Sequence, residues 1–151
     1  RLDGEDIVYL VRLPSARTSY GATIPGRRLP ALSTSSGRAM LGCLTVDERR
    51  SAVSEWALKT FTPKTLLDRD LIGTLVEAAA RDRFAIASDQ ILLNEIGVSV
   101  AVDGAKGGRY AVQCSLSGTV WSEERARDEI VPHLRDVANA LSGSCLGIRL
   151  R

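Results

Sequence analysis

Hydrophobic and polar residues alternate along two neighbouring stretches of the chain, and this pattern predicts a β-hairpin. The stretches are Ile96–Asp103 and Arg109–Ser117, and the glycine-containing segment 104–108 between them supplies a turn. One face of the predicted hairpin carries the large apolar side chains expected of a surface that packs against a helix: Ile96, Val98, Val100, Val102, Tyr110, Val112, Cys114 and Leu116.

The opposite face of this hairpin has no large apolar or charged residues and consists of Gly97, Ser99, Ala101, Ala111, Gln113, Ser115 and Ser117. A solvated sheet face usually carries long polar side chains, and a packed face carries valine or leucine. Small, hydroxyl-bearing residues are typical of a wall that leaves room for a bound polar molecule. Two other interpretations stay open: close packing of the sheet against a loop, and cover by another subunit.

Two further segments are rich in β-branched or aromatic residues and predict additional strands. The run Glu5–Arg12 predicts a strand near the start of the chain, with Arg17–Ile24 as its hairpin partner. The apolar run Phe84–Ala87 predicts a short strand.

Capping residues and apolar spacing predict two helices in the first half of the chain. Arg27–Leu32 leads into a helix over about Thr34–Leu44. A second helix follows over Arg49–Trp56, because Thr45 and Glu48 in front of it form a capping box.

Two more helices are expected in the second half. Asp68 or Asp70 caps a helix that extends to about Arg81, and the last helix begins after Ser122. Pro132 must kink or divide that last helix, because proline lacks the backbone N–H and clashes with the preceding turn. The order of elements predicts an α+β domain, a mostly antiparallel sheet covered by helices.

The five residues 33–37, STSSG, stand at the start of the first predicted helix. N–H groups at a helix start carry partial positive charge and attract carboxylates or phosphates, and a glycine lets a small anion approach the backbone. N-capping, the alternative explanation, needs only one of these residues. Ser35, Ser36 and Gly37 are therefore candidate ligand contacts.

Composition and charge narrow the class of protein. Of 151 residues, 44% are hydrophobic, 25% charged and 5% aromatic, which excludes a disordered tail. A net charge of +2 is too balanced to favour nucleic-acid binding by this segment. No apolar run is long enough to cross a membrane and no signal peptide is visible, so we expect a cytoplasmic location.

Side chains that could carry catalysis or bind a metal are sparse. His133 is the only histidine, and the three cysteines lie far apart without a CxxC pair. Neither a nucleophile elbow nor a phosphate-binding glycine loop occurs in the sequence. The sequence therefore predicts no enzyme activity, no metal site and no cofactor.

Several motifs, taken in order, resemble those of one protein family. Residues 28–42, RLPALSTSSGRAMLG, resemble the R-L-P-x-x-x-[ST]-[SA]-x-G-[KR]-[AV]-[LM]-L-A pattern in the effector-binding domains of IclR-family bacterial transcription regulators. Residues 61–65, FTPKT, resemble that family's T-P-x-T segment, and residues 112–118 resemble its A-[LI]-S-[VI]-S-G motif. The first motif looks most like the branch that senses protocatechuate, hydroxybenzoate and related aromatic acids.

The resemblance implies a GAF-like α+β sensor domain over residues 1–151, with a pocket on one side of the sheet for a small carboxylate effector. It also implies a homodimer or homotetramer. In the family, DNA is contacted through an N-terminal winged helix-turn-helix domain, which is absent from these 151 residues. The function implied is control of oligomer state and operator binding by a small, aromatic carboxylate.

The resemblance also implies particular pocket residues. Leu29 matches an apolar lining position ahead of the first helix, and Ser35 and Ser36 match two small residues whose backbone faces the effector. Ser115 and Ser117 match paired hydroxyls that hold the effector's carboxylate.

The chain departs from the family pattern on the other side of the pocket. Gly97 replaces a cysteine or serine, and Ala87 replaces an acidic residue, although Asp89 could accept a hydrogen bond from a ring hydroxyl. Leu93 and Tyr20 are expected to contact the apolar body of the effector. The missing side chain at Gly97 widens the site, which predicts an effector bulkier or less polar than a two- or three-carbon keto acid.

Two alternatives from other classes remain. A small hydrolase would use Ser115 or Cys114 as its nucleophile. An oligomerisation module without a ligand would bury the small-residue face against a partner chain. Turnover of an ester or thioester would favour the first, and assembly without saturable ligand binding would favour the second.

Overall fold

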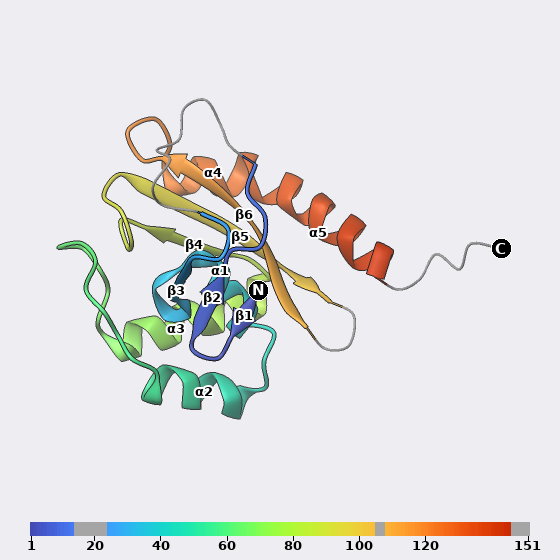
Figure 1. Ribbon diagram of the computed structural model, residues 1–151. Helices are drawn as coiled ribbons and strands as arrows, with labels where there is room; N and C mark the ends of the chain where they lie inside the picture. The colour runs from blue at the N-terminus through green and yellow to red at the C-terminus, as the bar shows by residue number, and fades with distance from the viewer. Residues whose placement is uncertain (14–23, 105–107, 146–151) are drawn as a thin grey trace.

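Two three-stranded antiparallel sheets form the framework of the protein, with a short helix between them (Figure 1). The computed structural model describes residues 1–13, 24–104 and 108–145. The first sheet has the order β1–β2–β3, with bounds Leu2–Asp3, Asp6–Val8 and Arg28–Pro30. The second sheet has the order β4–β5–β6, with bounds Ala85–Ser88, Glu95–Asp103 and Arg109–Ser117. The α+β class predicted from the sequence is confirmed.

The helices lie on both sides of the second sheet (Figure 1). Their bounds, in chain order, are Ala31–Ser33 for the 3-10 helix η1, Ser35–Leu41 for α1, Val46–Glu55 for α2, Arg69–Asp82 for α3, Glu123–Glu129 for α4 and Val131–Cys145 for α5. The predicted capping box at the start of α2 is confirmed, because Thr45 and Glu48 satisfy each other's backbone N–H groups. Asp68, not Asp70, caps α3.

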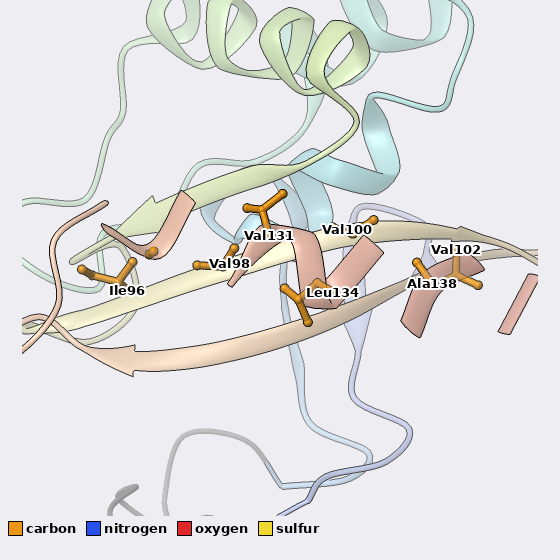
Figure 2. Close-up of a cluster of buried hydrophobic side chains, with 8 residues drawn as sticks. Ile96, Val98, Val100, Val102, Val131, Leu134 and Ala138 are labelled. Carbon is orange, nitrogen blue, oxygen red and sulfur yellow. The ribbon is translucent and has the colours of Figure 1, made fainter. Parts of the chain in front are cut away.

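The predicted hairpin is β5 and β6, and its large apolar face packs against α5. Gly97 pairs with Ser115, and the register continues to Asp103 opposite Arg109. Figure 2 shows the β5 side chains of this face turned toward those of α5. The buried cluster consists of Ile96, Val98, Val100, Val102, Ala126, Val131, Leu134 and Ala138. Burial of this cluster fixes which face of the hairpin is left for other contacts.

The N-terminal region differs from the sequence-based expectation. The predicted strand Glu5–Arg12 is shorter, Asp6–Val8, and it pairs with β1 and β3. The predicted partner Arg17–Ile24 lies outside the described residues except for Ile24, which belongs to no strand. Pro30 is tolerated in β3 because β3 is an edge strand of its sheet, where a missing N–H costs little.

The sequence predicted that Pro132 would either kink the last helix or divide it. The helix is divided, into α4 and α5. Pro132 is the second residue of α5, and a first-turn N–H has no partner within the helix in any case. In the described part of the chain, no helix is long and apolar enough to cross a membrane.

Candidate functional site

A cavity opens beside the start of α1, between the two sheets. It holds about 380 Å³ of empty space, open solvent included. The lining residues are Tyr9, Leu29, Ser33, Thr34, Ser35, Ala87, Gln90, Ile91, Glu95, Gly97 and Gln113. The predicted site residues Leu29, Ser35 and Gly97 are therefore brought together here.

The hydroxyl groups at the start of α1 attach this helix to the second sheet. The Ser99 Oγ lies 2.8 Å from the Ser35 Oγ and 3.0 Å from the Ser36 Oγ. The Ser36 hydroxyl also donates to Gln113 Oε1 at 2.9 Å. Ser35, Ser36 and Ser99 are all buried, so part of the small-residue face of the hairpin is explained by close packing, against a helix instead of a loop.

Gly37 does not line the cavity, and its missing side chain has a packing role. A Cβ on Gly37 would lie 2.0 Å from the carbonyl oxygen of Ala31 in η1. Thr34 caps α1 by accepting a hydrogen bond from the Gly37 N–H at 3.0 Å. The missing side chain at Gly37 therefore allows α1 and η1 to pack closely. Ser36, the preceding residue, is also not among the lining residues.

The expected widening at Gly97 is not free space. A Cβ on Gly97 would lie 2.8 Å from the Ser35 Oγ and 3.3 Å from the Gln113 Nε2. Those two side chains occupy the volume that a cysteine or serine would fill. The amide of Gln113 therefore forms part of the cavity wall beside Gly97.

Ser115, Ser117, Leu93 and Asp89 are not among the residues that line the cavity. The Ser115 hydroxyl accepts a hydrogen bond from Gln113 Nε2 at 3.2 Å. The Ser117 and Thr119 hydroxyls bond to each other at an exposed position, and Leu93 is 52% exposed. Tyr20 lies outside the described residues.

Asp89 forms an ion pair that ties the loop after β4 to the segment before α3. Its Oδ2 lies 2.7 Å from Lys64 Nζ, and its Oδ1 accepts a hydrogen bond from the Asn94 N–H. Both interactions lower the pKa of Asp89. The Thr65 hydroxyl donates to the carbonyl oxygen of Gln90, so the T-P-x-T-like segment fastens the loop that supplies Gln90 and Ile91 to the cavity.

Sequence reasoning missed Tyr9, Gln90, Ile91 and Glu95. The Tyr9 hydroxyl donates to Gln113 Oε1 at 3.2 Å. Burial, aided by the nearby charge of Glu95, raises the pKa of Tyr9 to about 12. The alternation of β5 could have indicated Glu95, since it precedes Gly97 by two residues and shares its face. The sequence held no comparable signal for Tyr9.

A buried cation lies behind one wall of the cavity. Arg38 is 2% exposed, and its Nε donates to the carbonyl oxygen of Leu32 at 2.8 Å. Its Nη2 donates to Gln90 Oε1 at 3.4 Å. Burial lowers the pKa of Arg38 to about 10, against a smaller opposing effect of the Glu123 charge. Among the described residues no carboxylate lies close enough to form an ion pair with Arg38. An anion in the cavity would reduce the cost of holding this charge away from water.

No histidine or cysteine is among the described residues that line the cavity. His133 is exposed on α5, which packs on the other face of the second sheet. Burial raises the pKa of the Cys114 thiol, which disfavours the nucleophilic thiolate. Within residues 1–13, 24–104 and 108–145, no group of histidine, cysteine and acidic side chains could hold a metal ion.

Comparison with known proteins identifies the class to which this fold and cavity belong. Residues 1–143 match the model of the family "Bacterial transcriptional regulator IclR C-terminal". The chain therefore belongs to the family of C-terminal domains of IclR-type bacterial transcription regulators.

The chain is similar to one curated regulator over nearly its whole length. It is 28% identical over 147 residues to the p-hydroxybenzoate hydroxylase transcriptional activator of Acinetobacter baylyi. The match covers 93% of this chain and 54% of the activator, so the chain spans about half the length of that relative.

Two solved structures show the same fold. A transcriptional regulator from a Rhodococcus species is 29% identical with a TM-score of 0.83, over 94% of this chain and 57% of that one. The inducer-binding domain of the PobR transcription factor from Acinetobacter, a double mutant in complex with 3-hydroxybenzoic acid, is 27% identical with a TM-score of 0.79. That match covers 93% of this chain and 83% of the PobR chain.

Proposed function

We propose that this chain is the small-molecule-sensing domain of an IclR-type regulator, and that its effector is a small aromatic carboxylate. The observation that carries the proposal is the cavity at the start of α1, with a buried guanidinium behind its wall. The similarity to an activator of p-hydroxybenzoate hydroxylase and to a domain in complex with 3-hydroxybenzoic acid supports the aromatic class.

The effector's contacts follow from the lining. Leu29 and Ile91 offer apolar surface to an aromatic ring, and the Ser35 hydroxyl offers a polar group at the start of α1. Gln90 also lines the cavity, but its Nε2 protons are donated to the carbonyl oxygens of Lys64 and Ser88. The carboxylate would lie toward Gln90, because Arg38 stands behind that residue. Ser115 would act through Gln113, whose amide it accepts from.

Effector binding would be coupled to assembly through α1. This helix contacts strands of both sheets, so a ligand at its start favours one arrangement of the two sheets over another. We propose that the regulator works as a homodimer or homotetramer in the cytoplasm. Operator binding would then be the task of a separate winged helix-turn-helix domain.

The test is thermal unfolding of the chain with benzoate, hydroxybenzoates, protocatechuate, glyoxylate and pyruvate, each beside its neutral amide. A ligand that binds only the folded state adds about 2.7 kcal/mol of stability at a hundredfold excess over Kd. We expect an aromatic acid to raise Tm by several degrees and its amide to raise it less. Tighter binding of glyoxylate or pyruvate than of every aromatic acid would contradict the proposed effector class.

A matched pair of variants locates the binding. Ile91→Trp places a bulky ring in the cavity wall, whereas Leu92→Trp changes the neighbouring side chain, which is 39% exposed and lies outside the lining. The first should abolish the ligand-induced shift and the second should preserve it. No shift with any acid, together with an intact multimer in light scattering, would favour the oligomerisation module.

A further inference from the structure

Glu95 lies in the wall of the cavity, and none of the described residues pairs with its carboxylate. It precedes Gly97 by two residues on β5, so both lie on the face opposite α5. Glu95 is partly buried, and among the described residues its carboxylate forms no ion pair and accepts no side-chain hydrogen bond. A carboxylate in this setting can only accept hydrogen bonds.

Tyr9, which also lines the cavity, has a hydroxyl oxygen that can still accept a hydrogen bond. The Tyr9 hydroxyl has a single proton, and it donates that proton to Gln113 Oε1. The same oxygen accepts from the Ser36 hydroxyl, and one Gln113 Nε2 proton goes to Ser115. The unused capacity of Tyr9 and Glu95 therefore suits a ligand group that donates.

The cavity is electrically asymmetric. Tyr9 and Gln113 mark its β6 side, where the negative charge of Glu95 acts on Tyr9 more strongly than the positive charge of Arg27 does. Gln90 follows β4 on the other side of β5, and the guanidinium of Arg38 lies behind it. Coulomb interactions in a partly dry site push a ligand carboxylate away from Glu95 and toward Arg38. The opposite end of the ligand then faces Glu95.

On the basis of the proposed function, we infer that Glu95 is a specificity-determining residue, which selects aromatic acids that carry a hydrogen-bond donor, such as a ring hydroxyl, away from the carboxylate. The sequence predicted that Asp89 accepts a hydrogen bond from a ring hydroxyl. In the structure the Asp89 carboxylate instead pairs with Lys64 and accepts a hydrogen bond from the Asn94 N–H. Glu95 is free to take that role in the described structure.

Isothermal titration with benzoate and with 2-, 3- and 4-hydroxybenzoate tests this inference on the wild-type chain, Glu95→Ala and Glu95→Gln. Glu124→Gln is the matched control, because it removes an exposed carboxylate from α4 outside the cavity. A hydrogen bond to a charged acceptor predicts that the wild type binds at least one hydroxybenzoate about tenfold or more tightly than benzoate. Glu95→Ala should reduce this ratio to about twofold, because the hydroxybenzoate loses its hydrogen bond while benzoate binds as before or more tightly.

The outcomes separate the inference from the proposed function. Equal affinity of the wild type for benzoate and every hydroxybenzoate, or an unchanged ratio in Glu95→Ala, overturns the inference and leaves the proposed sensor intact. Absence of binding by all four acids and the rest of the acid panel overturns both. Circular dichroism melts of each variant without ligand establish that a changed ratio reflects specificity and not unfolding.

Discussion

At Gly37 the backbone of α1 approaches η1 so closely that an added Cβ would lie 2.0 Å from the Ala31 carbonyl oxygen. Backbone atoms cannot yield as a flexible side chain can, so Gly37→Ala must displace α1. We expect a loss of about 1–3 kcal/mol in the free energy of unfolding, or no folding, measured by urea denaturation.

Gly73 provides the matched control for this prediction. It lies inside α3, and a Cβ there would be 3.7 Å from Val53 Cγ1, an ordinary contact. Gly73→Ala should therefore raise the free energy of unfolding by about 0.5–1 kcal/mol through helix propensity. Equal stability of the two variants would show that α1 and η1 do not pack as described.

At the scale of elements, the attachment of α1 to β5 depends on one buried hydroxyl. The Ser99 Oγ bonds to both Ser35 and Ser36. Ser99→Ala leaves the Ser35 hydroxyl without a side-chain partner among the described residues, while Ser36 keeps Gln113. We expect a loss of about 1–3 kcal/mol in urea denaturation, because an unsatisfied buried polar group costs its desolvation.

The control for this prediction is Ser54→Ala, whose hydroxyl donates to the Ser51 carbonyl oxygen on the exposed face of α2. It should change the free energy of unfolding by less than about 0.5 kcal/mol. If Ser99→Ala is equally mild, the serines do not hold the helix to the sheet.

Elements with strong local signals were the ones that the sequence predicted well. The alternation in β5 and β6, the capping box at Thr45 and the break at Pro132 depend on neighbouring residues, so a short window contains the cause. The pairing of β2 with β3 was missed because two strands of three residues each carry too little pattern, and their partnership is set by packing between distant segments.

The candidate site was predictable in part for the same reason. Leu29, Ser35 and Gly97 lie in motifs that a single stretch of sequence displays, and they line the cavity. Tyr9 directly follows β2 of the other sheet, so no local pattern could place it. Asp89 was a plausible ligand acceptor in the sequence, but only the fold brings Lys64 to within 2.7 Å of it.

At the scale of the whole molecule, the cavity is where the two sheets and α1 meet. Residues from β3, the start of α1, the loop after β4, and strands β5 and β6 all contribute to it. The loop after β4 is in turn fastened to the segment before α3 through Asp89 and Lys64. A ligand that orders this junction therefore acts on most elements of the chain at once, which suits a sensor.

The most direct test of the account is a titration of the ¹⁵N-labelled chain with 4-hydroxybenzoate, followed by amide chemical shifts. If the cavity binds the acid, saturable shifts occur at Leu29, Ser35, Gln90 and Gly97, and none at the exposed α2 residues Asp47 and Ser54. Saturable binding whose shifts avoid the cavity and cluster elsewhere would contradict the central claim, as would a spectrum that stays unchanged at every lining residue.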